Sequence, residues 1–228
     1  MAESRAGRAV QSLLPRRVVV APAPMPDLPA LLLAVVMLAY WGRVGVMSVR
    51  IRRRTRTLSG VVPEQGLERF LWLFFIPLVA AWLVLPFFAA FRTSGMLAVP
   101  EAARGDGWLA VRVLAAGAAL ALLVATIRCW RRMGRHWKMA VTPGEKQPLI
   151  TDGPFARVRH PIYGYQILLM LASLCVVPTV PMLVVALVHV VLMVTKARNE
   201  ERYLTGVHGA AYDAYAARTG RFFPRLSG

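Results

Sequence analysis

Long apolar runs separated by short polar and basic segments are the dominant pattern along this chain. Residues 28–49, 67–91 and 108–129 form runs that are each long enough to cross about 30 Å of hydrocarbon as a helix. Two shorter runs, 163–177 and 181–197, are separated only by the sequence VPTVP, which predicts a tight helical hairpin. The pattern therefore predicts an all-α integral membrane protein with about five transmembrane helices, the last two forming a C-terminal helical hairpin.

The positions of the prolines support this interpretation. Pro161 falls near the first turn of the fourth predicted helix, where its missing N–H group is not needed, and Pro178 and Pro181 bracket the hairpin turn. Pro77 and Pro86 lie inside the second apolar run. In a membrane helix such prolines are expected to kink the helix and not to end it.

Composition strengthens the membrane assignment and excludes other classes. Hydrophobic residues make up 57% of the chain and charged residues 17%, with a mean hydropathy of +0.52, which is too apolar for an ordinary soluble domain. The net charge of +17 does not indicate nucleic-acid binding, because the basic residues lie between apolar runs. Cys129 and Cys175 form no CxxC pair, so we expect packing roles for both and neither a disulfide framework nor a metal site.

The distribution of charge predicts the topology. The segments 50–66 and 128–159 are strongly basic, whereas 92–107 balances two arginines with two acids. By the positive-inside rule, the two basic segments and the C-terminal tail face the cytoplasm, and the N-terminus lies outside. The basic N-terminal tail, 1–26, is rich in Arg, Ala and Pro and is expected to be disordered. The bias of the chain towards Ala, Arg, Val and Leu suggests a prokaryotic inner membrane.

Two polar motifs stand out against this apolar background. TDGPFARVRHPIYG occupies 151–164, and KARNEE occupies 196–201 at the end of the fifth apolar run. Polar residues this dense at a membrane edge are costly unless they bind something. A hairpin with both ends inside brings the two motifs to the same level, next to the segment 134–159. We therefore expect an assembled site at the cytoplasmic surface.

The residue types in these motifs indicate the chemistry of that site. The carboxylates of Glu200 and Glu201 can accept hydrogen bonds from ribose hydroxyls or an ammonium group, and can stabilise a nearby sulfonium cation. His160 can donate or accept a hydrogen bond near neutral pH. Basic side chains that can bind a carboxylate of a substrate or cofactor are present at Arg159, Lys196 and Arg198, of which only the arginines offer a bidentate fork.

The C-terminal part of the chain resembles the isoprenylcysteine carboxyl methyltransferase family of membrane enzymes. The resemblance lies in the order of its motifs: TDGPF, RHPIYG, a hairpin, KARNEE and GAAYDAYAARTGRFFP (209–224). The resemblance covers 134–224. It implies that S-adenosyl-L-methionine is bound on the cytosolic side and that a methyl group passes to a lipophilic acceptor, with carboxylate O-methylation as the family's reaction. No GxGxxG sequence follows a plausible strand, so a Rossmann-type site is not expected.

The resemblance also implies particular site residues. The cofactor-binding positions it places in this chain are Gln147, Pro148, Leu149, Ile150, Phe155, His160, Pro161, Ile162, Tyr163, Glu200 and Glu201. The substrate-contacting arginine of the family falls on Lys196, and Arg198 and Arg159 are further candidates for catalysis. Phe155 stands where the family usually has tyrosine. The chain thus divides into the tail 1–26, three transmembrane helices in 27–133, and a methyltransferase core in 134–228 that ends in a cytoplasmic helix.

Two other functions remain open from the sequence. Membrane sterol reductases share a related C-terminal arrangement with an RHPNYxGE-like motif and a nicotinamide cofactor, but here Ile162 replaces the Asn and Tyr165 the acid. A non-catalytic transporter or scaffold could use the basic face to bind anionic lipid. The best support for this alternative is His189 in the fifth run, an ionisable group inside a membrane span. No other buried charge is expected in the spans. The expected partners are membrane lipids and a lipophilic small-molecule or lipid-anchored substrate, with no nucleic acid.

Overall fold

The computed structural model describes residues 25–56, 60–142, 144 and 148–225, and within them the chain is helical. Residues 1–24 of the predicted disordered tail lie outside this part. The α-helices are α2 (Leu28–Thr55), α3 (Gly66–Phe91), α4 (Asp106–Met133), α5 (Pro161–Val176), α6 (Val180–His208) and α7 (Ala210–Arg218). Short 3-10 turns are η1 (Glu101–Ala103), η2 (Gly134–His136) and η3 (Gly153–Ala156).

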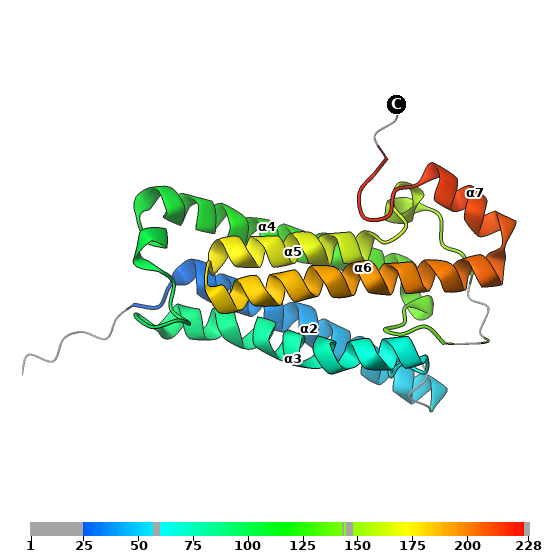
Figure 1. Ribbon diagram of the computed structural model, residues 1–228, viewed down its shortest axis with the longest axis horizontal. Coiled ribbons are helices and arrows are strands. Elements are labelled where there is room, and N and C mark those ends of the chain that lie inside the picture. Colours follow the sequence, from blue (N-terminus) through cyan, green and yellow to red (C-terminus); the bar gives the residue numbers. More distant parts are fainter. Residues whose placement is uncertain (1–24, 57–59, 143, 145–147, 226–228) are drawn as a thin grey trace, which may run out of the picture.

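The helices α2 to α6 form an elongated bundle, and α7 lies across one end of it (Figure 1). Four of them, α2, α3, α4 and α6, are long and apolar enough to cross a membrane, and α5 is a shorter apolar helix. Many of their outward-facing side chains are large and apolar, for example Leu73 (70% exposed) and Leu114 (73% exposed). Such a surface fits lipid and not water, so the prediction of an all-α, multi-pass membrane protein is confirmed.

Aromatic and polar side chains fix the helices to one another inside the bundle. The fully buried Tyr40 lies edge-on to Trp130 of α4, with ring centroids 5.0 Å apart, and its hydroxyl accepts a hydrogen bond from Gln166 of α5 at 2.6 Å. Trp82 of α3 donates its indole N–H to Ser173 of α5 at 2.9 Å. Polar atoms in a hydrocarbon environment need partners within the protein, and these bonds also set the rotation of each helix.

The C-terminal hairpin is present as predicted. Pro161 occupies the first turn of α5, and the Thr179 side chain caps α6 by accepting from the Met182 N–H. Both predicted interior prolines lie within α3, which continues through them. However, α6 runs well past the predicted end at residue 197, because KARNEE consists of residues that favour a helix. Gly209, with a φ of 53°, ends it.

Two buried charges contradict the expectation that the spans contain none besides His189. Arg112 of α4 has a side chain that is 1% exposed, and it pairs with Asp27 at 2.5 Å. Its Nε also donates to the carbonyl of Val176 at the end of α5, at 2.8 Å. Glu68 in the first turn of α3 is 2% exposed. Hydropathy averages over a window, so it cannot register a single charge whose partner comes from another helix.

The cysteines behave differently from each other. Cys129 is buried in α4, as expected for a packing residue, whereas Cys175 is exposed on α5, so a packing role for it is wrong. Both are free thiols.

The two polar motifs lie at the same end of the bundle. In Figure 1 the C-terminal ends of α2 and α4, the start of α5 and the whole of α7 are at one end, opposite the start of α2 and the turn between α5 and α6. We call the end that contains α7 the arginine-rich end, because α2 finishes there with a cluster of exposed arginines: Arg50, Arg52, Arg53, Arg54 and Arg56. The juxtaposition that the hairpin predicted is therefore observed.

Candidate functional site

The start of α5 is held in place by the C-terminal segment of the chain. The N–H groups of Arg159 and His160 donate to the carbonyls of Gly220 and Arg221 at 2.8 and 2.9 Å, and the Gly220 N–H donates back to Arg157 at 3.1 Å. These bonds form a short parallel pairing around the bridge between residues 158 and 220. The tail thus fixes the backbone that carries His160.

This pairing explains a glycine of the RHPIYG motif. A Cβ atom on Gly164 would lie 2.5 Å from the carbonyl oxygen of Phe222, so only glycine lets the C-terminal segment lie against the first turn of α5. The motif therefore includes a packing position as well as its chemical groups.

Glu201 ties this arrangement together from α6. Its carboxylate accepts from Arg159 Nε at 3.0 Å and from Arg221 at 2.7 Å, and the Glu201 side chain is 15% exposed. Arg159 additionally donates to the carbonyls of Ala216 and Thr219. The guanidinium of Arg159 is thus engaged by three groups of the fold.

The neighbouring acid, Glu200, faces a different set of side chains. Its Oε2 accepts the hydroxyl proton of Tyr163 at 2.9 Å, and His160 Nδ1 lies 3.7 Å from the same oxygen. The rings of His160 and Tyr163 are stacked with 8° between their planes. The two polar motifs thus meet in one carboxylate, phenol and imidazole group.

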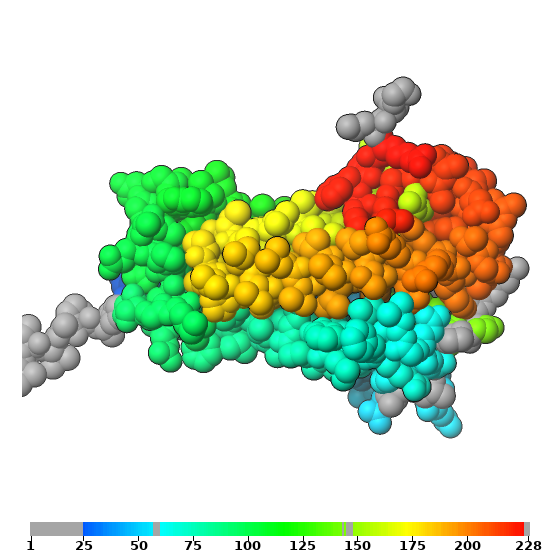
Figure 2. Space-filling model, in the orientation of Figure 1, coloured from blue at the N-terminus to red at the C-terminus, as the bar shows by residue number. Residues whose placement is uncertain are grey.

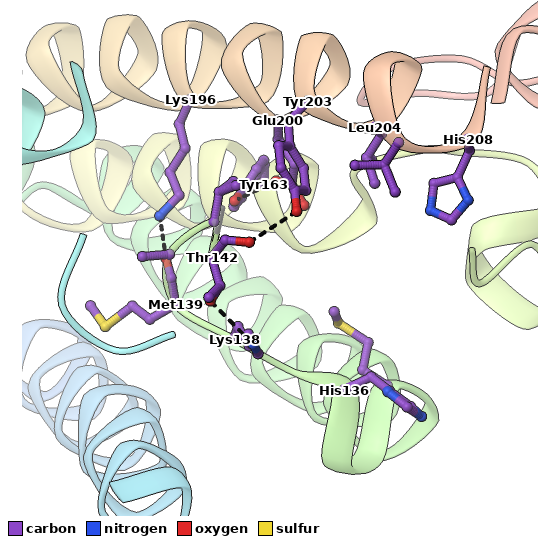
Figure 3. Close-up of a pocket in the computed structure, with 14 residues that line it drawn as sticks. His136, Lys138, Met139, Thr142, Tyr163, Lys196, Glu200, Tyr203, Leu204 and His208 are labelled. Carbon is purple, nitrogen blue, oxygen red and sulfur yellow. Dashed lines mark hydrogen bonds between the residues drawn. The ribbon is translucent and has the colours of Figure 1, made fainter. Parts of the chain in front are cut away.

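Glu200 and Tyr163 open onto a cavity between α6 and the segment 138–142, which we call the polar pocket (Figure 3). Because helical residues four apart share a face, α6 lines one wall with Lys196, Glu200, Leu204 and His208. The opposite segment is held by hydrogen bonds to α6: Lys196 Nζ donates to the carbonyl of Met139, and the Tyr203 hydroxyl donates to that of Thr142 at 2.9 Å.

A second cavity, the outer pocket, adjoins the polar pocket and shares Glu200 and Leu204 with it. Its free volume is about 90 Å³, smaller than the roughly 300–1,000 Å³ usual for small-molecule sites. The Tyr212 hydroxyl there is buried and has no hydrogen-bond partner among the described residues, whereas His160 Nε2 lies 3.4 Å from Glu201 Oε1. Burial raises the pKa of Tyr212, so its hydroxyl stays protonated at neutral pH.

A third cavity, the aromatic chamber, lies between the helices and is lined mainly by rings: Tyr40, Trp41, Phe75, Trp130 and Trp137. It shares Tyr163 and Lys196 with the polar pocket. The two residues therefore stand at the boundary between a polar cavity and an apolar one.

The structure brings together most of the predicted cofactor residues. The outer pocket is lined by Pro148, Leu149, Ile150, Phe155, His160 and Glu200, together with Arg159. Tyr163 lines the polar pocket, and Ile162 lines the aromatic chamber. Pro161 is buried at the start of α5, and Gln147 lies outside the described residues.

Arg198 and Glu201 face away from these cavities. They line a separate open groove with Arg202 and Arg221 on another side of α6. Lys196 is the basic candidate that lines both the polar pocket and the aromatic chamber. A role in binding for Arg198 and Glu201 stays a prediction.

Several lining residues were missed by the sequence interpretation. They are Tyr40, Glu68, His136, Lys138, Tyr203, His208 and Tyr212. The four-residue spacing from Lys196 through Glu200 points to His208 once α6 is extended. For Tyr40 and Glu68, which come from helices far away in the sequence, no such local signal exists.

Fold and cavities define a multi-pass membrane protein in which a polar site at one end of the bundle borders an aromatic chamber. Residues 113–206 match the isoprenylcysteine carboxyl methyltransferase (ICMT) family. This match covers most of α4, all of α5 and most of α6, and it confirms the resemblance that the motifs indicated. This part of the chain is thus similar to a membrane methyltransferase family.

Two similar proteins carry names that refer to metal resistance. The nickel-cobalt-cadmium resistance protein NccN of Alcaligenes xylosoxydans xylosoxydans is 28% identical over 123 residues, 54% of each chain. The cobalt-zinc-cadmium resistance protein CzcN of Cupriavidus metallidurans is 32% identical over 127 residues, 54% of this chain and 55% of that protein. The chain thus spans about half the length of these relatives, whose names specify no methyl acceptor. No solved structure matches significantly.

Proposed function

We propose that this protein is a membrane-embedded methyltransferase that transfers a methyl group from S-adenosyl-L-methionine to a lipophilic acceptor. One observation supports this most directly: Lys196 and Tyr163 line both the polar pocket and the aromatic chamber. A water-soluble cofactor and a lipophilic acceptor can therefore reach the same point from opposite sides. The family match over 113–206 supports this reaction class.

The outer and polar pockets fit the cofactor by the chemistry of their donor set. S-adenosyl-L-methionine supplies an electrophilic methyl group on a positively charged sulfur. Glu200 would hold the amino group or a ribose hydroxyl and favour the positive charge electrostatically. Leu149, Ile150 and Phe155 offer apolar surface for the adenine, and the free Tyr212 hydroxyl can donate a hydrogen bond.

The acceptor would occupy the aromatic chamber, which lies next to a smaller cavity between α3 and α6. This side pocket shares Phe75, Met193 and Lys196 with the chamber. Figure 2 shows α6 and α3 side by side on the molecular surface, and we propose that the acceptor enters laterally between them. The helix walls then align the acceptor and exclude water, which are the main requirements for a methyl transfer.

Among the three basic candidates for substrate contact, we assign Lys196, because it lines the cavities where acceptor and cofactor would meet. We further propose that the arginine-rich end faces the cytoplasm of a prokaryotic inner membrane and that the N-terminus lies outside. The exposed arginines at the end of α2 support this orientation through the positive-inside rule.

Ligand binding to the detergent-solubilised protein tests the proposal. Isothermal titration with S-adenosylmethionine, S-adenosylhomocysteine and NADPH should show binding of both adenosyl ligands and none of NADPH. Glu200→Gln should weaken S-adenosylhomocysteine binding about tenfold or more, since a hydrogen bond to a charged group contributes about 1.5–3 kcal/mol. Asp213→Asn, a change in an exposed acid of α7, is the control and should bind normally.

The outcomes separate the candidate functions. A protein that stays folded but binds neither adenosyl ligand would overturn the methyltransferase proposal. Binding of NADPH alone would favour the reductase alternative. Unchanged affinity in Glu200→Gln would leave the methyltransferase class standing but remove Glu200 from the cofactor site.

A further inference from the structure

Glu68 is the only acidic residue in the buried set of the described chain, being 2% exposed. Its Oε2 accepts the N–H of Val141 at 3.1 Å, whereas Oε1 is equally buried and has no hydrogen-bond partner among the described residues. The amide of Asn199 donates to Gln65 at 2.7 Å, and the same side chain is also a hydrogen-bonding neighbour of the Glu68 carboxylate. A carboxylate oxygen left in this condition is costly unless a ligand or proton reaches it.

The carboxylate lies where the acceptor would arrive. Glu68 lines the side pocket between α3 and α6 together with Lys196 and a group of apolar residues: Leu71, Trp72, Phe75, Leu192 and Met193. The indole N–H of Trp72 is also buried without a partner among the described residues. The side pocket borders the aromatic chamber, and Phe75 and Lys196 line both. A lipophilic molecule in that route would meet Glu68 with its polar end.

The charges around this point do not favour an acceptor that is itself an anion. Glu68 and Glu200 lie within electrostatic range of each other and of Lys196. The Lys196 ammonium already donates to the Met139 carbonyl, and the Lys138 ammonium donates to the Thr142 hydroxyl at 3.1 Å. A carboxylate acceptor would bring a third negative charge between two carboxylates in a poorly solvated site.

We infer, building on the proposed methyl transfer, that the acceptor is a lipophilic molecule whose nucleophilic atom carries a proton, such as a thiol, phenol or amine, and that Glu68 Oε1 accepts this proton. The acceptor X–H bond breaks, and its proton passes to Glu68. The X–C bond forms as the sulfur–methyl bond of S-adenosylmethionine breaks, and S-adenosylhomocysteine leaves. Water then receives the proton from Glu68, which balances the reaction.

Methylation of such an acceptor differs from methylation of a carboxylate, because a carboxylate is already an anion and needs no base. A positioned base typically contributes about 10²–10⁴-fold to rate. The titratable groups that face Glu68 are Lys196 and Glu200 of α6 and Tyr163 of α5, so their charges contribute to its titration. The pH profile must therefore be compared between variants and not interpreted alone.

The first test uses the unmodified protein and acceptors with the same hydrocarbon chain. Long-chain thiol, phenol, amine and carboxylate compounds are compared for methylation with radiolabelled S-adenosylmethionine. At least one of the proton-bearing compounds should be methylated with at least a tenfold higher kcat/KM than the carboxylate. If the carboxylate is the preferred acceptor, the inference is wrong even though the protein is a methyltransferase.

The second test compares Glu68→Gln with Glu64→Gln, which changes an exposed acid just before α3. Glutamine can still accept the Val141 N–H but cannot take a proton. The Glu68→Gln rate should fall about a hundredfold and lose the rise of rate with pH on the acid side, while S-adenosylhomocysteine affinity stays unchanged. Glu64→Gln should match the wild type in all three measurements.

A binding measurement without cofactor adds a readout independent of turnover. Titration of the thiol or phenol in buffers of different ionisation enthalpy reports the protons exchanged on binding, and this number should differ between wild type and Glu68→Gln. An unchanged pH profile and an unchanged proton count would overturn the role of Glu68. Loss of S-adenosylhomocysteine binding by the wild type would instead refute the proposed function.

Discussion

The ion pair between Arg112 and Asp27 provides a sharp test of how this bundle is stabilised. Arg112→Met removes a guanidinium whose side chain is 1% exposed and keeps a similar length of apolar chain. The change leaves the Val176 carbonyl without its 2.8 Å donor and Asp27 without its cation. It therefore releases three elements from one another: the start of α2, the second turn of α4 and the end of α5.

The expected magnitude follows from the burial of the two partners. Removing one partner of a buried ion pair costs about 3–5 kcal/mol. Asp27 is 17% exposed and keeps its capping bond from the Ala30 N–H at 3.0 Å, so water and the helix start compensate part of the loss. We expect Arg112→Met to lower the free energy of unfolding by about 3 kcal/mol.

The chain offers a matched control in an exposed pair at the other end. The side chains of Arg132 and Asp152 are 50% and 57% exposed, so Arg132→Met should change stability by less than about 1 kcal/mol. Reversible unfolding by SDS in mixed micelles, followed by circular dichroism, gives both values. In Asp27→Asn/Arg112→Met the uncompensated carboxylate is gone, so about 1 kcal/mol or more should be recovered. Equal losses in Arg112→Met and Arg132→Met would refute this reasoning.

Three further changes test the C-terminal part of the site. Gly164→Ala should push the Phe222 carbonyl away and destabilise the protein by about 1–3 kcal/mol, seen as faster hydrogen exchange and proteolysis in the C-terminal segment while the membrane helices stay protected. Glu201→Gln leaves two arginines without their carboxylate and should cost about 3 kcal/mol in the same unfolding assay, and an effect below about 1 kcal/mol would show that solvent replaces it. Tyr163→Phe removes the 2.9 Å bond to Glu200 and should weaken S-adenosylhomocysteine binding about tenfold in calorimetry, with unchanged affinity counting against the proposed site.

The bundle itself was largely predictable because crossing a membrane is a property of single segments. Each apolar run had to become a helix, since a helix satisfies its own backbone hydrogen bonds in hydrocarbon. The hairpin followed from short runs joined by a proline-containing turn, and it brought the two polar motifs together as expected. The end of α6 was missed because hydropathy ends at KARNEE although helix propensity does not.

The sequence could not predict which of Glu200 and Glu201 faces the polar pocket. Adjacent residues of a helix point about 100° apart, so one of the pair faces the polar pocket and the other faces the C-terminal segment. The motif contains both acids, but it does not specify how α6 is rotated about its axis. Only the packing of α6 against α5 and the C-terminal segment assigns Tyr163 to Glu200 and the two arginines to Glu201.

The amino-acid sequence by itself determined the membrane class, the approximate helices, and the meeting of two polar motifs at one end. It could do so because the partition of a segment between water and lipid depends on that segment alone. The tertiary structure decided which side chains share a cavity, placing Glu68 of α3 beside Lys196 of α6 and placing Tyr163 in the walls of both the aromatic chamber and the polar pocket. Such contacts depend on the rotation and register of helices that are distant in the sequence, and packing between them fixes both.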